Sequence, residues 1–258
     1  MLAVLSPAKT LDLESPLPTR RHSQPRLLDE AVALAEVMAG QDAAELRRLM
    51  GISEELALTN VERWRTFTPE HTPATARPAA LTFDGPVYRG LDAGHRFDAR
   101  GWTRAQRTVR ILSGLYGVLR PLDLIEAHRL EMGTRLATER GATLVQWWGA
   151  RPTDLLAEDL AQSPGPPVVV NLASAEYWSV VDEERLGARV VTPRFEDRDR
   201  SGRWRVVVVH AKRARGRMAG WLATHPVRSV KALTAFDEGY RHVPDLSTPD
   251  EPVFRAVG

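Results

Sequence analysis

Four cations gather within six positions of one predicted helix, which spans residues 211–224. Lys212 and Arg215 are three residues apart and Arg213 and Arg217 are four apart, so each pair stacks along the helix surface. We place these charges at the start of the helix, where the helix dipole disfavours cations. A bound polyanion would offset that cost, whereas a solvated charged face needs no ligand, and the pattern leaves both interpretations open.

A second polar group follows a short apolar run at residues 3–6, which is a predicted buried strand and leads into Ser6, Lys9 and Thr10. Ligand sites in sheet proteins collect beyond the carboxyl ends of strands. An ammonium and two hydroxyls at this place could therefore hold an anion, although the glycines of a phosphate-binding Walker loop are absent. A polar loop without a ligand is an equally good interpretation.

Residues 104–124 match the pattern of a helix-hairpin-helix element, with Gly-Leu-Tyr-Gly at 114–117 between two apolar segments. In such hairpins main-chain N–H groups contact a phosphate, which binds nucleic acid without reading its sequence. The alternative is a tight turn in the core, with Leu115 and Tyr116 packed inside. The candidate contacts in this element are Arg110, Ser113, Gly114, Leu115, Tyr116, Gly117 and Arg120.

Two further segments carry polar groups that have both a structural and a functional interpretation. Arg129 and Glu131 would share one face of an extended segment. There they form either a structural ion pair or an anion clamp with a general base. Asn171 and Ser174 end a predicted strand, and Ser174 either caps the next helix or lines an anion-binding corner.

The composition predicts neither a metal nor a cofactor. The chain has no cysteine, which excludes disulfides, thiolate metal sites and a cysteine nucleophile. Its seven histidines are scattered, without an H-x-H or H-x-x-x-H pair. No apolar run reaches the length of about 18 residues that a membrane span needs, and residues 1–7 lack the features of a secretory signal. We therefore expect a cytoplasmic protein without a membrane partner.

The elements that must position these residues alternate along a chain of 258 residues with a net charge of only +2. Asp42 and Ser53 each begin a predicted helix, and Gly51 ends the first of them. The apolar run at 168–172 predicts a buried strand that is parallel to its neighbours. Residues 189–196 and 203–210 predict the two strands of a hairpin.

These elements predict an α/β (α+β) fold, a single domain over residues 1–258 with a central mixed sheet surrounded by helices. Arginine outnumbers lysine by 32 to three, which makes the lysines informative. A compact ammonium fits a tight phosphate pocket better than a guanidinium does. Lys9 and Lys212 both fall in the segments described above.

Six motifs over residues 1–240 are specific when they are taken together. They are LSPAKTLD at 5–12, VYRGL at 87–91, LSGLYGVLRPLDL at 112–124, RLEMG at 129–133, NLAS with Glu-Tyr at 171–177, and AK with ARG at 211–216. Through these motifs the chain resembles the bacterial peroxide stress resistance protein YaaA family. It departs from the family pattern at Pro86, where an Asp is common.

The resemblance implies a cytoplasmic protein, induced by hydrogen peroxide, that limits oxidative damage by keeping unincorporated iron low. It also implies an α/β fold with a helix-hairpin-helix element beside a basic cleft, and binding to double-stranded and branched DNA. On the matching motifs, residues 113–117 would form the hairpin. Lys9, Arg120, Lys212 and Arg215 would line the cleft.

Two functions follow from these observations. The first is non-specific DNA binding that limits oxidative damage, with iron lowered by an indirect route. The second is an enzyme that acts on a nucleotide, a nucleobase or damaged nucleic acid, with Lys9, Glu131 and Lys212 as catalytic candidates. Convergence of the polar residues in one pocket, together with a lowered lysine pKa, would favour it. A small anionic ligand fits either function. The complete set of candidate nucleic-acid contacts is Lys9, Arg110, Ser113, Gly114, Leu115, Tyr116, Gly117, Arg120, Arg129, Lys212, Arg213, Arg215 and Arg217.

Overall fold

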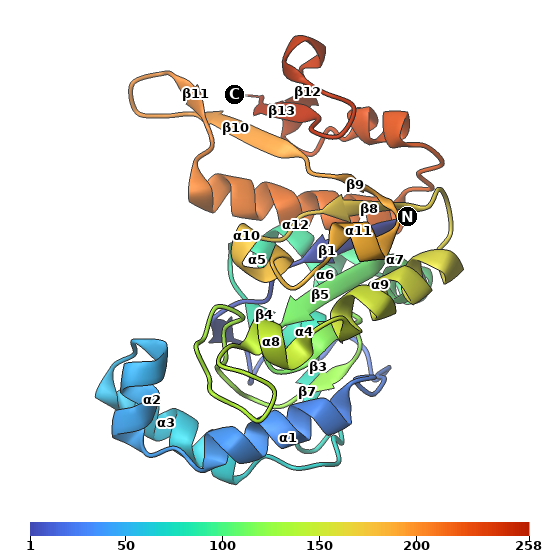
Figure 1. Cartoon of the computed structure of the whole chain (residues 1–258). Helices are drawn as coiled ribbons and strands as arrows, with labels where there is room; N and C mark the ends of the chain where they lie inside the picture. Colours follow the sequence, from blue (N-terminus) through green and yellow to red (C-terminus); the bar gives the residue numbers. More distant parts are fainter. Residues whose placement is uncertain (258) are drawn as a thin grey trace.

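The structure is a computed structural model that describes residues 1–257; Gly258, which the single-domain prediction includes, lies outside the described residues. Its central sheet has the strand order β6-β5-β1-β8-β9 (Figure 1). The strands are β1 (Leu2–Leu5), β5 (Val109–Ser113), β6 (Gly117–Leu119), β8 (Val168–Asn171) and β9 (Arg189–Val191). All pairings are parallel except that of β6 with β5. The predicted central mixed sheet of an α/β fold is therefore confirmed.

A second sheet has the order β11-β10-β13-β12 and pairs residues from the C-terminal quarter of the chain. Its strands are β10 (Arg194–Arg198), β11 (Trp204–Arg205), β12 (Tyr240–His242) and β13 (Val253–Ala256). Two short antiparallel pairs complete the strands: β2 (Thr10–Leu11) with β4 (Phe83–Asp84), and β3 (Arg77–Pro78) with β7 (Leu124–Ile125).

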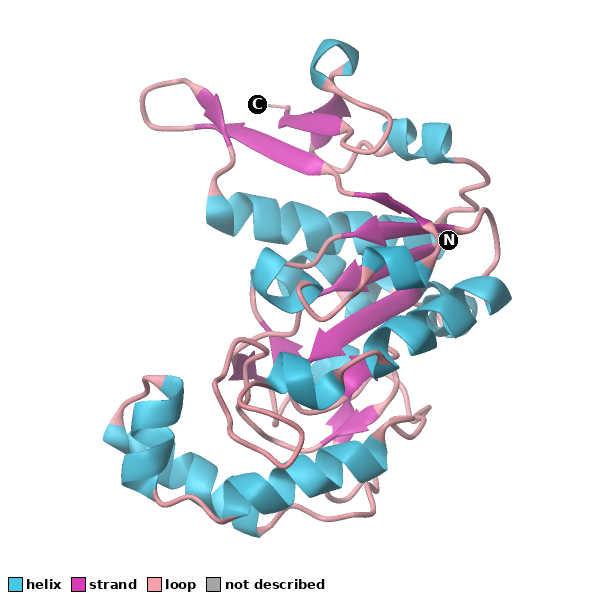
Figure 2. Ribbon diagram, in the orientation of Figure 1, coloured by secondary structure: helices cyan, strands magenta, loops and turns pink. Residues whose placement is uncertain are grey.

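Helices surround the central sheet, as the sequence predicts (Figure 2). They are α1 (Leu28–Ala39), α2 (Ala43–Met50), α3 (Glu54–Arg65), α4 (Ala79–Thr82), α5 (Pro86–Leu91), α6 (Ala93–Arg96), α7 (Ala99–Thr108), α8 (Leu144–Trp148), α9 (Arg151–Gln162), α10 (Ala175–Trp178), α11 (Glu183–Leu186) and α12 (Val208–Thr224), with 3-10 helices η1 (Val230–Ala235) and η2 (Pro244–Leu246).

The helical hairpin of α2 and α3 forms where the sequence predicts it. The Asp42 side chain accepts a hydrogen bond from the Glu45 backbone N–H, and the Glu45 side chain accepts one from the Asp42 backbone N–H, which makes a capping box. Gly51 ends α2 in the left-handed region with a φ of 62°. Ser53 caps α3 by accepting from the Leu56 N–H. The hairpin therefore depends on local signals, and it lies at one end of the molecule (Figure 1).

Helix α12 contacts both β1 of the central sheet and β10 of the second sheet. It begins at Val208, so the predicted strand over 203–210 is wrong beyond β11, where only Trp204 and Arg205 pair with β10. The cations of the basic segment consequently lie in the second and third turns of the helix rather than in its first turn. Because the dipole effect falls off within one turn, the cost that we assigned to their position is small.

Two glycines allow α12 to cross α5 at backbone contact. A Cβ atom on Gly216 would overlap the Val87 carbonyl oxygen and lie 2.7 Å from the Leu91 backbone nitrogen. A Cβ atom on Gly90 would in turn overlap the Arg213 carbonyl oxygen. Backbone atoms cannot change rotamer to make room, so this close approach requires glycine on both helices. The crossing fixes the basic helix against α5.

Candidate functional site

The carboxyl ends of β1 and β8 lie side by side, because these strands are parallel neighbours with Ala3 opposite Val170. The chain leaves β1 at Ser6 and leaves β8 toward Ser174. The Ser174 N–H donates a hydrogen bond of 2.9 Å to the Ser6 hydroxyl, which itself donates to the Ser174 hydroxyl at 3.3 Å. Two loops that are about 170 residues apart in the sequence thus meet at one edge of the sheet, where open α/β sheets bind ligands.

A pocket of about 270 Å³ opens at this edge. Three cations, three carboxylates and four hydroxyls line it, together with small apolar side chains. The polar lining residues are Ser6, Lys9, Thr10, Asp84, Glu131, Ser174, Glu176, Tyr177, Lys212 and Arg215. The three catalytic candidates Lys9, Glu131 and Lys212 therefore lie in one pocket, as the enzyme interpretation requires.

Glu131 is shared by two cations. The Lys9 ammonium lies 2.7 Å from one of its carboxylate oxygens, and Arg129 donates to the other at 3.1 Å. The Lys9 side chain is 63% exposed, whereas the side chains of Arg129 and Glu131 are mostly buried. The predicted ion pair between Arg129 and Glu131 forms, and Lys9 presents the outer positive charge at the pocket mouth.

The opposite wall of the pocket comes from α12. Lys212 is exposed and makes no ion pair with a carboxylate of residues 1–257. Arg215 is partly buried and donates to the Ala173 carbonyl oxygen at 3.2 Å, and burial lowers the pKa of its guanidinium. Asn171 accepts from the Ala173 N–H, so its side chain shapes the loop rather than the pocket. Lys212 is thus the cation on this wall that is available to a ligand.

Tyr177 and Glu176 form the floor near the 131–135 loop. Burial raises the pKa of the Tyr177 hydroxyl, so this group stays protonated and can donate a hydrogen bond. Glu176 accepts from the Gly133 N–H at 3.1 Å. Although Ser174 precedes α10, its hydroxyl caps no backbone N–H of that helix and bonds to Ser6 instead.

Comparison with known proteins shows which family the chain belongs to. A family model for peroxide stress protein YaaA matches residues 1–246. The chain belongs to the YaaA family. A UPF0246 protein of Dinoroseobacter shibae is 48% identical over 255 residues, which cover 98% of this chain and 94% of the relative. A UPF0246 protein of Tolumonas auensis is 46% identical over 256 residues, covering 99% of this chain and 97% of the relative.

The prediction of a helix-hairpin-helix element at residues 104–124 of this YaaA family protein is wrong. Residues 113–117 are instead the tight turn of a β-hairpin between β5 and β6, in which Ser113 pairs with Gly117. Leu115 and Tyr116 are fully buried, and Trp148 donates to the Gly114 carbonyl oxygen. The turn at Gly114 and Gly117 is therefore the alternative that the sequence also allowed, a tight turn packed in the core. Residues 113–117 are all buried in the structure.

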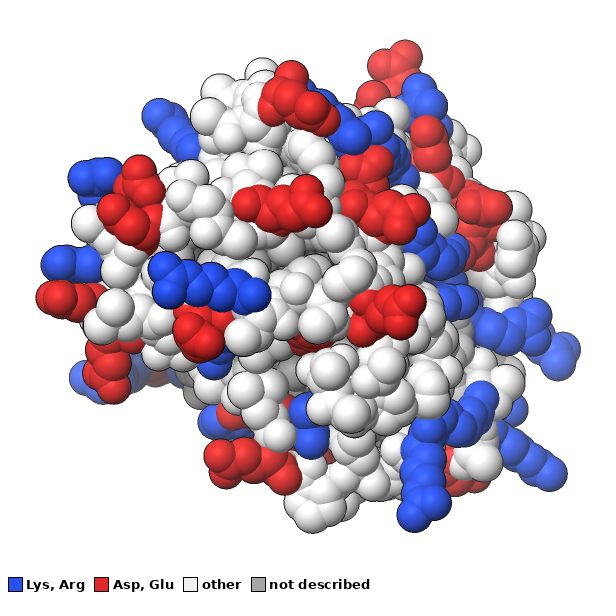
Figure 3. All heavy atoms as spheres, turned by 90° about the horizontal axis from the view of Figure 1, so that it is seen from below, with Lys and Arg blue, Asp and Glu red and all other residues white. Residues whose placement is uncertain are grey.

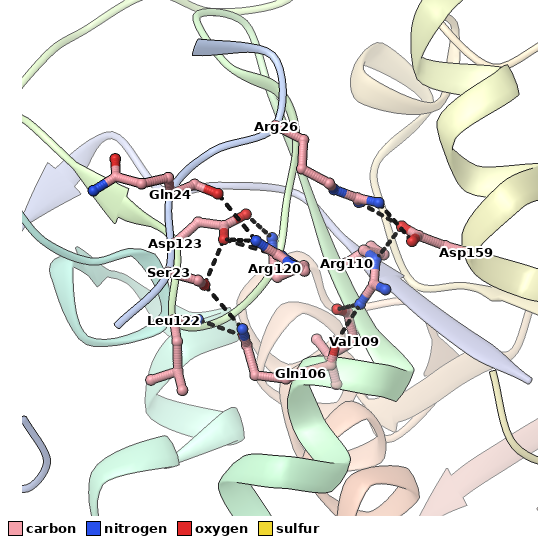
Figure 4. Close-up of polar contacts among 10 residues, drawn as sticks. All are labelled: Ser23, Gln24, Arg26, Gln106, Val109, Arg110, Arg120, Leu122, Asp123 and Asp159. Carbon is pink, nitrogen blue, oxygen red and sulfur yellow. Dashed lines mark hydrogen bonds and ion pairs between the residues drawn. The ribbon is translucent and has the colours of Figure 1, made fainter. Parts of the chain in front are cut away.

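Arg110 also has a structural role instead of the predicted contact with DNA. It is 4% exposed, and it forms an ion pair of 2.5 Å with buried Asp159, which Arg26 also binds (Figure 4). Its Nη1 group donates to the carbonyl oxygens of Gln106 and Val109. The sequence could not reveal this, because Asp159 lies 49 residues away on α9.

Three other arginines that we predicted to contact DNA either bind groups of the protein itself or lie outside the pocket. Arg120 binds the buried Asp123 carboxylate and the Gln24 carbonyl oxygen (Figure 4). Arg217 donates to the Glu238 carbonyl oxygen. Arg213 is exposed on α12 but does not line the pocket.

A second hollow of about 550 Å³, which the sequence did not reveal, lies between α2 and the 131–135 loop. Its lining includes Arg48 and Arg135, which are exposed and have no ion-pair partner in the described part of the chain. A hydrogen bond connects the two linings, since Glu176 of the pocket accepts from the Gly133 N–H of this hollow. On the face seen from below, by contrast, acidic and basic side chains are interspersed (Figure 3). The sequence predicts the helix that carries Arg48, at residues 42–50. It could not show the hollow, because the other side is formed by the 131–135 loop, which is distant in the sequence.

A small cavity beneath the pocket is lined by His128 and Ser113, next to Lys9 and Glu131. Burial lowers the pKa of the His128 imidazole to about 4, and it lowers that of buried His71 to about 4 as well. His71 bonds to the Tyr116 hydroxyl at 2.8 Å, and the rings of Tyr116 and His128 are 5.2 Å apart. Both histidines are therefore neutral at neutral pH and belong to one aromatic cluster.

We expect the stability of the protein to fall between pH 6.5 and 4. In that range the unfolded chain binds protons at His71 and His128 that the folded chain excludes, which costs about 3 kcal/mol for each group at the lower end. Urea unfolding at pH 7, 5.5 and 4.5 measures this slope. H128Q should flatten it, whereas H22Q, at an exposed position, should leave it unchanged. Equal slopes in wild type and H128Q would contradict the assignment.

Within residues 1–257, none of the helices of this YaaA family protein has both the length and the apolar character needed to cross a bilayer. The same residues contain no group of three or more His, Asp or Glu side chains arranged to hold a metal ion.

Proposed function

We propose that this protein acts in the peroxide response by binding DNA without reading its sequence, and that bound DNA is thereby protected from oxidative damage. The observation that carries the proposal is that the pocket and the hollow beside α2, whose linings are connected by one hydrogen bond, both present exposed cations without an ion-pair partner in residues 1–257. Lys212 lines the pocket at the end of β1, and Arg48 and Arg135 line the hollow beside α2. Arg213 adds an exposed charge on α12 next to Lys212.

Phosphate contacts of this kind give affinity without sequence preference. Lys9 contributes an exposed ammonium, although Glu131 balances part of its charge. The α2–α3 hairpin, in place of residues 113–117, brings Arg48 to the second hollow. We propose in addition that intracellular iron is lowered by an indirect route, since the described residues offer no ligand set for direct sequestration.

A salt series of DNA binding tests this proposal. Each phosphate contact adds about 0.9 to the slope of log K against log salt, so K212A should bind duplex and four-way junction DNA several-fold more weakly, with a slope smaller by about 1. K212A combined with R48A should lower the slope by about 2. The matched control is K231A, which removes an exposed lysine from η1, outside both hollows, and should bind like wild type.

Affinity that barely changes with salt would overturn DNA binding through phosphates. Equal binding by wild type and K212A would favour the second candidate function, an enzyme that acts on a nucleotide, a nucleobase or damaged nucleic acid. The specific support for that candidate is that Lys9, Glu131 and Lys212 line one pocket, with Lys9 and Glu131 in contact. Nucleotides would then be screened for binding to wild type and to E131Q.

A further inference from the structure

Another pocket, of about 220 Å³, lies at the amino end of β1. The pocket that Lys9 and Lys212 line lies at the opposite, carboxyl end of the same strand. The lining of the pocket at the amino end comes from the N-terminus, which Figure 1 marks, from α7 and α12, and from two loops. Its lining residues are Met1, Ala3, Arg104, Thr108, Pro164, Gly165, Leu222, Ala223, His225, Pro226, Val227 and Arg228.

The interior of this pocket is apolar. Ala3 and Ala223 are at most 1% exposed, and their short side chains leave the space that the pocket occupies. The loop at Gly165 closes one side, because this residue has a φ of 89° and its Cα would place a Cβ only 2.9 Å from the Val227 carbonyl oxygen. Glycine therefore allows the two loops to pass at close range. The result is a preformed hollow with mostly apolar walls, to which Thr108 and His225 add polar groups.

The charged groups that line the pocket are of one sign. Arg104 and Arg228 are exposed at its rim, Met1 brings an amino group that donates to the Pro164 carbonyl oxygen, and no Asp or Glu belongs to the lining. Arg104 uses one N–H group to bind the Thr224 carbonyl oxygen at 3.0 Å, which holds its guanidinium at the end of α12. Arg228 has neither a hydrogen bond nor an ion pair within the described residues. A guanidinium in this setting is a donor for a carboxylate.

We infer that this pocket binds a small carboxylate with an apolar body, such as a short aliphatic or aromatic acid. The walls would bury the body of the ligand, and Arg228, supported by Arg104, would bind its carboxylate. The positive rim disfavours cations, and the apolar walls offer little to the sugar or base of a nucleotide. The site uses none of the residues proposed to bind DNA, so it stands independently of that function.

Titration calorimetry with octanoate, 1-octanol and octylammonium tests the inference on the whole chain. A charge-assisted hydrogen bond is one of the stronger hydrogen bonds in proteins, so octanoate should bind at least about tenfold more tightly than 1-octanol, and octylammonium should not bind. R228Q should lower the affinity for octanoate about tenfold and leave that for 1-octanol unchanged. The matched control is R107Q, which removes an exposed arginine of α7 that does not line the pocket.

A second variant, V227W, fills the pocket and should abolish octanoate binding; its thermal unfolding midpoint checks that the chain still folds. Equal affinity for octanoate and 1-octanol, or full octanoate binding by R228Q, would overturn the role of the guanidinium. Unchanged binding by folded V227W would show that octanoate binds elsewhere, and the absence of saturable binding would overturn the site.

Discussion

G216A is expected to lower the free energy of unfolding by about 3 kcal/mol or more. The added methyl group would overlap the Val87 carbonyl oxygen, so α12 must move away from α5. Overpacking between side chains is often relieved by a change of rotamer, but here a Cβ atom, which has no rotamer, would overlap a backbone oxygen. Because α12 and α5 belong to the core that also supports the pocket, the displacement should reach Lys212 and the Pro86 side of the pocket.

Chemical denaturation of G216A and of G94A measures this effect. Gly94 lies in the short helix α6, where a Cβ would stand 3.6 Å from the nearest atom of Pro18 at ordinary contact distance. G94A should therefore be neutral or slightly stabilising, as alanine is in a helix. A G216A protein as stable as wild type would show that the two helices do not cross at backbone contact.

D159N is expected to destabilise the fold by about 3–5 kcal/mol, because it leaves Arg110 buried without its counter-charge. Burial raises the pKa of the Asp159 carboxyl, but the hydrogen bonds from Arg26 and Arg110 and their positive charges lower it by more. The net shift of the pKa is therefore downward. The stabilisation from its ionised form is complete above the ordinary value near pH 3.8 and is lost as the pH falls below it. This window lies below that of the two histidines.

The control for D159N lies on the same helix. Asp154 of α9 pairs with Arg185, but both side chains are about half exposed, so D154N should have little effect on stability. Urea unfolding at pH 7 compares the two variants. Similar stabilities of D159N and D154N would contradict a structural role for the buried arginine, and would return Arg110 to the candidates for ligand binding.

Local signals in the sequence predicted the elements that depend on them. Asp42, Gly51 and Ser53 identified the α2–α3 hairpin, and the apolar run at 168–172 identified β8 as a parallel strand. The segments after strand ends, around Lys9 and Ser174, also indicated where the pocket would form. Strand ends and caps are properties of a short stretch of chain, so a single sequence can show them.

The errors arose where distant contacts decide between two local possibilities. Gly114 and Gly117 allow a tight turn in either a helical or a strand hairpin, and only pairing of the flanking segments made it a β-hairpin. The valines at 206–209 favour a strand by propensity. Pairing with β10 ends at Arg205, however, and Val208 begins α12. Arg110 looked like a surface cation because its partner Asp159 is far away in the sequence.

The position of β1 in the sheet has a consequence for how the molecule is made. Leu2–Leu5 are buried between β5 and β8, whose registers bring Ala3 against Val109 and Val170. At a synthesis rate of about 5–20 residues per second, this strand waits roughly 8–30 s for its second neighbour to be translated. During that time one edge of this apolar strand has no partner, even after β5 has been translated. Folding of the sheet therefore has to follow translation of more than half of the protein, and it requires closure of long loops, which makes it slow.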